Sequence, residues 1–267
     1  MHEYEVSPDV FFFSTTRHGG VSKGNYASFN INHYCGDDAD DIRQNQRLLC
    51  ERLGIGDDRL IYPHQTHRTE VRQIDRHFLS LSESARQEAL EGVDALITDE
   101  RGVCIGVSTA DCIPVVIYDT EHHAVATVHA GWRGTVARIA EKAVAAMTHA
   151  YGSQPADMLA VIGPGISLEN FEVGDEVYEA FLHADFPMEM IAKKYPANGQ
   201  IVKLSNGQMK WHLDLPSCNG LQLQGCGLKK EKIQMSGICT FNQYEDYFSA
   251  RRLGINSGRI FTGALLR

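Results

Sequence analysis

The sequence lacks the paired cysteines of the common small metal and redox motifs. Its seven cysteines stand at positions 35, 50, 104, 112, 218, 226 and 239, and no two have CxxC spacing. This excludes a zinc ribbon and a thioredoxin-type site. An odd number of cysteines without a regular framework is typical of free thiols in a reducing compartment, so a cytoplasmic protein is expected. Any metal site must combine one cysteine with residues from elsewhere in the chain.

Long hydrophobic runs and an excess of positive charge are also missing. The run IPVVIY, Ile113–Tyr118, is far shorter than the roughly 20 apolar residues of a membrane-spanning helix. The stretch MHEYEVSPDVFFF has acids where a signal peptide needs a basic region. Lys and Arg number 25 against 34 Asp and Glu, which gives a formal net charge of −9. We therefore expect neither a membrane nor nucleic acid as a partner.

Internal repeats, low-complexity tracts and flexible linkers are absent, so residues 1–267 are expected to form one domain. Short β-branched or aromatic runs between turn residues predict strands at Val10–Thr16, Arg59–Tyr62, Thr69–Ile74, Val93–Thr98, Val103–Val107, Pro114–Tyr118, Ala124–His129 and Met158–Ile162. Apolar periodicity predicts helices at Asp38–Leu53, Trp132–Tyr151, Asp175–His183 and Leu215–Cys226. This order predicts an α/β protein, a layered α+β domain with a mixed central sheet flanked by helices. The oligomeric state has no signature in the sequence.

The sequence does contain a stretch rich in candidate functional residues, STADCIPVVIYDTEHHAVATVHAGWRG, from position 108 to position 134. Cys112 precedes an apolar strand, and a second strand runs back to His129, 17 residues further on. A strand–turn–strand hairpin would place the two side by side at one end of a sheet. Arg133 follows in a Gly-Trp-Arg-Gly turn that opens a helix, where free N–H groups and a guanidinium can hold an anion.

Three interpretations of Cys112 and His129 stay open on the residues alone. The pair can be a buried cysteine and a hydrogen-bonded histidine without further function. It can be a thiolate–imidazolium nucleophile, because a neighbouring histidine lowers a thiol pKa. It can also be a pair of zinc ligands. The stretch YPHQTHRTEV could then supply a third ligand, His67, and zinc would keep an open position for water or substrate.

Several blocks, in order over nearly the whole chain, resemble the laccase-domain family. Members of that family have been called polyphenol oxidases, purine nucleoside phosphorylase-type enzymes and, in one branch, peptidoglycan editing factors. The blocks are STTRHGGVS from position 14, FNINHYCGDD from 29, HQTH from 64, TADCIPV from 109, VHAGWRG from 128, IGPGISLENFEVGDEV from 162, CTFNQYEDYFSARR from 239 and SGRI from 257.

The resemblance implies one α/β domain with a metal pocket whose ligands are His67, Cys112 and His129, holding zinc or alternatively copper. It gives no support to His64, for which a surface or ligand-supporting role is the expectation. Two departures concern neighbouring positions. Arg68 stands where Gly or Ser often follows the ligand histidine, and Gly165 stands where relatives often have a cysteine.

The resemblance also implies a small-molecule substrate. The expected reaction is phosphorolysis of adenosine, inosine and methylthioadenosine, with deamination of adenosine as a side activity. A three-ligand zinc suits deamination, since it lowers the pKa of bound water to about 7. Asp111 is a candidate general base, or an orienting residue. His33 is a candidate proton donor to the purine, with a hydrogen-bonding role as the alternative.

Phosphorolysis needs groups that bind phosphate. Guanidinium groups match phosphate geometry, so Arg17, Arg133, Arg251 and Arg252 are the candidate phosphate or substrate contacts. Each also has the plain alternative of a solvated surface residue. Arg17 and Arg133 are favoured because each lies in a glycine-containing block.

Three other functions remain as alternatives. A copper polyphenol oxidase of the multicopper type needs many close histidine pairs, and the sequence has no His-x-His. An amide hydrolase, using either a Cys112–His129 dyad or zinc, could edit peptidoglycan precursors. A scaffold protein with structural zinc would need four protein ligands, of which the sequence offers three.

Overall fold

The computed structural model describes residues 1–196 and 209–267, in which strands form three sheets. The five-stranded sheet has the order β1-β2-β14-β6-β3: β1 (His2–Ser7), β2 (Val10–Ser14), β14 (Ile260–Leu266), β6 (Cys104–Thr109) and β3 (Leu60–Ile61). The six-stranded sheet has the order β13-β9-β7-β8-β5-β4: β13 (Ile233–Met235), β9 (Met158–Ile162), β7 (Ile113–Asp119), β8 (Ala124–Ala130), β5 (Val93–Thr98) and β4 (Glu70–Gln73). The small third sheet consists of β10 (Glu172–Val173), β12 (Met209–Leu213) and β11 (Ala192–Pro196).

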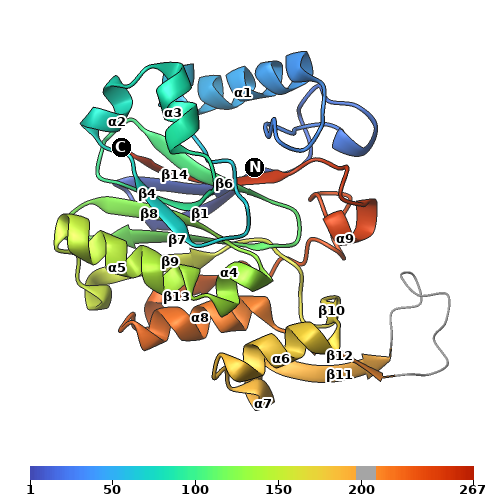
Figure 1. Ribbon diagram of the computed structural model, residues 1–267. Coiled ribbons are helices and arrows are strands. Elements are labelled where there is room, and N and C mark those ends of the chain that lie inside the picture. The colour runs from blue at the N-terminus through green and yellow to red at the C-terminus, as the bar shows by residue number, and fades with distance from the viewer. Residues whose placement is uncertain (197–208) are drawn as a thin grey trace.

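Helices cover the outer faces of the two larger sheets (Figure 1). The α-helices are α1 (Ala39–Leu53), α2 (Arg76–Ser80), α3 (Glu83–Ala89), α4 (Trp132–Val136), α5 (Ile139–Tyr151), α6 (Asp175–His183), α7 (Met188–Ile191), α8 (Leu215–Gly225) and α9 (Ala250–Leu253). Short 3-10 helices lie at Gly24–Tyr26, Asp57–Arg59, Pro155–Asp157 and Lys230–Lys232. None of the helices in the described ranges is long and apolar enough to cross a membrane.

The two larger sheets pack face to face around a buried apolar layer. Phe12 and Ile105 reach this layer from the five-stranded sheet, and Leu96, Val116 and Val125 reach it from the six-stranded sheet. Because successive side chains of a strand point to opposite faces, the next residues along each strand pack outward against helices. The predicted α/β class is confirmed, with two stacked sheets at its centre in place of one.

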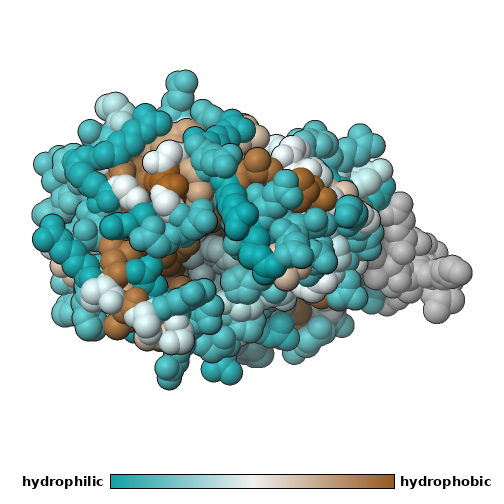
Figure 2. All heavy atoms as spheres, turned by 90° about the horizontal axis from the view of Figure 1, so that it is seen from above, coloured by the Kyte–Doolittle hydropathy of each residue, from teal (hydrophilic) through white to brown (hydrophobic). Residues whose placement is uncertain are grey.

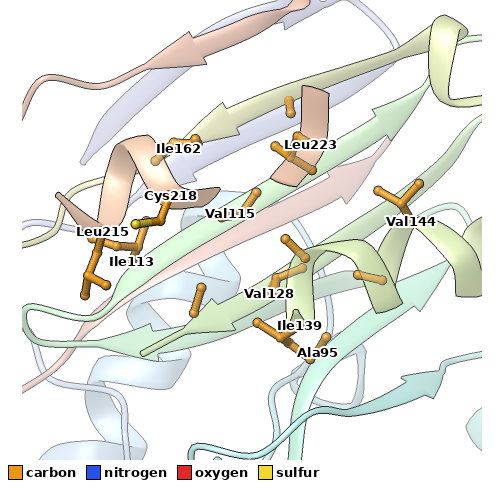
Figure 3. Close-up of a cluster of buried hydrophobic side chains, with 14 of the residues drawn as sticks. Ala95, Ile113, Val115, Val128, Ile139, Val144, Ile162, Leu215, Cys218 and Leu223 are labelled. Carbon is orange, nitrogen blue, oxygen red and sulfur yellow. The ribbon is translucent and has the colours of Figure 1, made fainter. Parts of the chain in front are cut away.

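A second apolar cluster fills the space between the six-stranded sheet and helices α5 and α8. Val115 and Val128 point from the sheet toward Ile139 of α5 and Leu223 of α8 (Figure 3). On the other side of the molecule, Leu49 of α1 packs on the outer face of the five-stranded sheet, whereas Phe78 of α2 packs into the layer between the two sheets (Figure 1). The surface seen from that side is largely hydrophilic, with smaller hydrophobic patches set into it (Figure 2). The sheets are therefore held by buried apolar contacts on both faces, which makes a rigid support for any site at their ends.

The predicted strands and three of the four predicted helices are found, with small shifts at their ends. Helix α1 begins after Asp38, whose side chain accepts hydrogen bonds from two N–H groups of the first turn, and ends at Gly54 with a φ of 68°. The single helix predicted over Trp132–Tyr151 is wrong. It is broken at Arg138, which has a φ of 64° and separates α4 from α5.

Tertiary contacts explain that break. The guanidinium of Arg138 donates to the carbonyl of Ala184 at 2.6 Å and lies 4.0 Å from the centre of the Phe186 ring. Periodicity could not show the break, because the apolar stripe continues through it. Ile139, Ala143 and Met147 are all fully buried against the sheet.

Candidate metal centre

The β7–β8 hairpin places Cys112 and His129 at the same end of the six-stranded sheet. In its register Ile113 lies opposite Ala130, and Pro114 opposite His129. Cys112 is the residue just before β7, so it comes beside the end of β8. The hairpin predicted from the 17-residue spacing therefore exists, and its open end brings the two side chains together.

His67 joins them from the loop before β4. Strand β4 runs parallel to β5, and β5 is paired with β8, so the start of β4 lies near the end of β8. The ligand atoms of His67, Cys112 and His129 all lie within 4.8 Å of one another. In residues 1–196 and 209–267 this is the one such group of three or more His, Cys, Asp or Glu side chains.

A buried carboxylate organises the group, and sequence reasoning missed it. Asp94 of β5 is fully buried. It accepts hydrogen bonds from the backbone N–H groups of Thr66 at 3.3 Å, His67 at 3.0 Å and Arg68 at 2.7 Å. These bonds hold the loop in a shape that gives His67 a φ of 61°, in the left-handed region that most residues avoid. One aspartate therefore fixes the backbone that presents the first ligand.

The same carboxylate orients the third ligand. Nδ1 of His129 lies 2.7 Å from Oδ1 of Asp94, and both side chains are buried. An ionised carboxylate can only accept, so Nδ1 keeps its proton and Nε2 is the nitrogen that can bind a metal ion. Burial raises the pKa of Asp94, but the hydrogen bonds from His129 and the loop outweigh it and lower the pKa. Asp94 is thus an anion that leaves His129 ready to ligate through Nε2.

The surroundings also favour the thiolate that metal binding requires. Burial raises the pKa of the Cys112 thiol, but the neighbouring His129 and His67 outweigh it and lower the pKa to about 6. Burial lowers the pKa of His129, yet Cys112 and Asp94 raise it to about 9. In the metal-free chain the two groups therefore form a thiolate–imidazolium pair. A metal cation can take the place of the imidazolium proton beside the thiolate.

Gly131 leaves room for whatever binds there. A Cβ atom at this position would lie 3.0 Å from Cδ2 of His67 and 3.1 Å from Sγ of Cys112. Such contacts are closer than ordinary van der Waals distances, so a side chain at 131 would press on two of the three ligands. Two imidazoles and one thiolate are donors that zinc and copper both accept. The residues present therefore fit a metal ion with one coordination position open.

A cavity of about 300 Å³ opens onto the three ligands. Its wall includes Tyr34, His64, Gln65, Ser108 and Arg259. The Gln65 side chain donates to the carbonyl of Ser108 at 2.8 Å and accepts from its N–H at 2.7 Å, which ties the loop of His67 to strand β6. The volume is at the lower end of the range for small-molecule sites, about 300–1,000 Å³.

Arg17 and Arg251 do not line this cavity. The guanidinium of Arg17 donates to the carbonyls of Ala27 and Tyr244, each at 2.8 Å. That of Arg251 donates to the carbonyl of Glu172 at 3.1 Å. Both side chains are thus engaged in holding loops together.

Arg133 and Arg252 lie outside the cavity wall as well. Arg133 lies over the ring of Trp132 at 4.3 Å, and Arg252 over the ring of Tyr244 at 4.5 Å. The arginine that does line the cavity is Arg259. It stands in the SGRI block noted in the sequence, but that block gave no chemical reason to choose it.

Asp111 and His33, the two predicted catalytic residues, are both held by other partners. The Asp111 carboxylate accepts from Thr240 Oγ1 at 2.7 Å and from the backbone N–H of Arg251 at 2.6 Å. Nδ1 of His33 lies 2.6 Å from the Tyr62 hydroxyl, and His33 lines a separate cavity of about 690 Å³. Neither residue is part of the wall around the metal ligands.

The model of the family described as multi-copper polyphenol oxidoreductase laccase matches residues 11–267. The chain belongs to that family. The match begins in β2 and includes every residue of the metal centre, so the site described above lies inside the family's domain. It also agrees with the resemblance drawn from the sequence blocks.

Individual laccase-domain proteins align with the chain over almost its full length. A protein named purine nucleoside phosphorylase, from Bacteroides thetaiotaomicron, is 45% identical over 258 residues, covering 97% of this chain and 92% of the relative. Adenosine deaminase RL5, from an unknown prokaryotic organism, is 43% identical over 251 residues, covering 94% and 92%. The crystal structure of YlmD from Geobacillus stearothermophilus superposes with a TM-score of 0.85 at 30% identity, covering 97% of this chain and 93% of YlmD.

Proposed function

We propose that this laccase-domain protein is a metal-dependent purine nucleoside phosphorylase that also deaminates adenosine. The observation that carries the proposal is the His67–Cys112–His129 cluster in the wall of a cavity sized for a small molecule. The names of its relatives give the substrate class, since one is a purine nucleoside phosphorylase and another an adenosine deaminase. Adenosine, inosine and methylthioadenosine, with phosphate, are the proposed substrates.

Zinc is the metal we assign to the cluster, with copper able to replace it because it binds such donors more tightly. His67, Cys112 and His129 would hold the ion and leave one position open. The ion would supply a Lewis acid at that position. Free cysteines throughout the chain fit the reducing cytoplasm, where the Cys112 thiolate stays available.

The chain's own residues orient the reactants. Asp94 fixes His129 and the loop of His67, so the ligands need no rearrangement when substrate arrives. We assign contact with phosphate to Arg259. Its guanidinium donates to the carbonyls of Ile255, Ser257 and Gly258, which uses three of its five N–H groups. The other two have no acceptor within residues 1–196 and 209–267, which leaves them for the phosphate that we assign to Arg259.

The family's description suggests copper oxidation of phenols as a second function. Multicopper catalysis needs several copper sites, supplied by many histidines. The part of the chain that the structure describes holds one cluster, with two histidines and one cysteine. A single copper ion there would support weak oxidation at most, so nucleoside chemistry is the better account of this site.

The test is to incubate the zinc-loaded protein with adenosine, with and without phosphate, and to separate the products by chromatography. Adenine that forms only with phosphate, and is lost in Cys112→Ala, supports the phosphorylase. Inosine that forms without phosphate and is lost in the same variant supports the deaminase. No purine product in either incubation would reject nucleoside chemistry and favour the amide hydrolase that edits peptidoglycan precursors.

A further inference from the structure

A second histidine–carboxylate pair stands at the rim of the metal cavity. Nδ1 of His64 lies 2.8 Å from both carboxylate oxygens of Glu91. The backbones of the two residues form an isolated parallel bridge, in which His64 N–H donates to Leu90 at 3.1 Å and Gly92 N–H donates to His64 at 3.0 Å. These main-chain hydrogen bonds therefore hold the side chains of His64 and Glu91 next to each other.

Aromatic stacking fixes the plane of the His64 ring. Tyr34 lies parallel to it, with ring centres 4.1 Å apart and an angle of 14° between the planes. The Tyr34 ring also lies against His33, with ring centres 3.9 Å apart, and the backbone N–H of Tyr34 donates to Asn32 Oδ1 at 2.7 Å. His64 is thus held both in its plane, by Tyr34, and in its rotation, by Glu91.

This arrangement leaves one reactive atom. The Glu91 carboxylate accepts a hydrogen bond from Nδ1–H, so Nε2 is the nitrogen that is left to exchange a proton with a substrate. Nε2 has no hydrogen-bond partner among residues 1–196 and 209–267, and His64 lines the cavity that holds the three metal ligands. A histidine in a substrate cavity that has a carboxylate at Nδ1 and no partner at Nε2 is a recurrent arrangement for proton transfer.

Stability does not account for the pair. The side chains of His64 and Glu91 are 36% and 61% exposed, and ion pairs that are this exposed contribute little to folding. His122 and Asp119 make the same Nδ1–carboxylate contact at 2.8 Å and line no part of the metal cavity. The location of His64 in the cavity is what distinguishes it from that pair.

We propose that His64 is the catalytic acid that protonates the purine during phosphorolysis, and that Glu91 is its positioning residue. This inference rests on the proposed function. The bond between C1′ and N9 breaks and its electron pair stays on the purine. A proton moves from Nε2 of His64 to N7, and a phosphate oxygen forms the new bond to C1′. The proton that phosphate loses on becoming the ester replaces, through solvent, the one that His64 gave.

The test compares two substrates in His64→Gln, using the metal-loaded full chain. Inosine needs a proton on its leaving base, whereas 7-methylinosine already carries a positive charge at N7 and needs none. We expect kcat for inosine to fall by about 100-fold or more, the usual share of an acid catalyst. For 7-methylinosine kcat should stay within roughly threefold of the unmodified protein, because the step that His64 serves is bypassed.

Three controls make the result decisive. Glu91→Gln should lower kcat for inosine in the same selective way but by less, since it leaves Nε2 in place. His122→Gln removes a matched pair away from the cavity and should change neither substrate. Bound metal should be equal in all variants, which separates loss of the acid from loss of the site.

Each outcome bears on one statement. Equal losses for inosine and 7-methylinosine in His64→Gln would overturn the assignment, as would unchanged kcat for inosine. If the unmodified, metal-loaded protein fails to split inosine at all, the proposed function itself is rejected. Wild-type turnover of inosine with a substrate-selective loss in His64→Gln would establish the acid.

Discussion

The β7–β8 hairpin has a histidine–aspartate pair at each end, and the two ends compare closely. At the open end Nδ1 of His129 lies 2.7 Å from Asp94, and at the turn Nδ1 of His122 lies 2.8 Å from Asp119. Both aspartates are fully buried, but His129 is 3% exposed and His122 is 43% exposed.

The difference lies in what else each end gathers. At the turn, Asp119 accepts from the N–H groups of Glu121 and His122, so its carboxylate completes the turn that joins the strands. At the open end, the histidine kept in place by Asp94 meets a thiol and a second imidazole beside a cavity. The same pair thus serves a turn at one end and a candidate metal centre at the other, which shows that a His–Asp contact alone does not indicate function.

Removing the histidine at each end should give the largest contrast. His129→Ala takes away a metal ligand and leaves the Asp94 carboxylate without one partner in a buried site. We expect bound metal to fall to background and the free energy of unfolding to fall by about 3 kcal/mol. Metal analysis and denaturant titration measure both. Retention of one metal per chain by His129→Ala would contradict the ligand set.

Changing the aspartate at each end of the hairpin should give the next largest difference, which is in metal affinity. Asp94→Asn removes the negative charge that keeps the proton on Nδ1 of His129. The same charge accepts hydrogen bonds from the backbone N–H groups of the His67 loop, and these bonds are weakened as well. Metal affinity should fall by about 10–100-fold, the usual effect of losing a residue that supports a ligand. Competition with a chromophoric chelator measures it. Asp119→Asn is the matched change, and an equal loss of affinity there would show that the effect is general instability.

Acidity distinguishes the open end in the metal-free protein. The lowered pKa of Cys112, about 6, means that its thiolate is present above that pH and is lost as pH falls through it. Alkylation by iodoacetamide should therefore rise about tenfold between pH 5 and pH 7. Cys226, whose pKa burial raises to about 11, is an internal reference that should react little in this range. Peptide mapping gives both rates, and bound zinc should suppress the first.

The smallest effect is expected from His122→Ala at the turn. This change removes a half-exposed partner of Asp119 but leaves the two backbone N–H donors of the turn. The free energy of unfolding should fall by at most about 1 kcal/mol, with metal content and turnover unchanged. Thermal melting and metal analysis check this. A loss of metal would mean that the two ends of the hairpin are coupled.

The sequence predicted that Cys112 and His129 lie side by side because their placement depends on a single hairpin, whereas the full set of three candidate ligands came from the family resemblance. The two residues stand 17 positions apart, which fits one hairpin, and the register shows them at its open end. Asp94 could not be found in this way. It lies in a mostly apolar strand, and the role of its buried carboxylate depends on the His67 loop and on strand β8, which come to it from other parts of the chain. A charged residue inside an apolar strand was the available signal.

The arginines, in contrast, show what the sequence could not predict. The chemistry of Arg17 and Arg251 and their sequence blocks predict phosphate contacts, but long side chains reach whichever carbonyl the fold puts near them. The direction in which they point is a tertiary property. The position at which a helix breaks also depends on tertiary contacts, as Arg138 shows. The burial of Ile139 and Met147, in contrast, follows directly from their spacing in the sequence.

The position of β14 between β2 and β6 bears on the order in which the protein folds. The hydroxyls of Ser14 and Thr262 meet at 2.8 Å although 248 residues separate them, so the five-stranded sheet forms through very distant contacts. Such pairing is slow, whereas a hairpin forms in about 1–10 μs. We expect Cys112 and His129 to meet early, and His67 to arrive only when β4 docks on β5. The metal ion would then act as a clasp between a fast-forming part of the chain and a slower one.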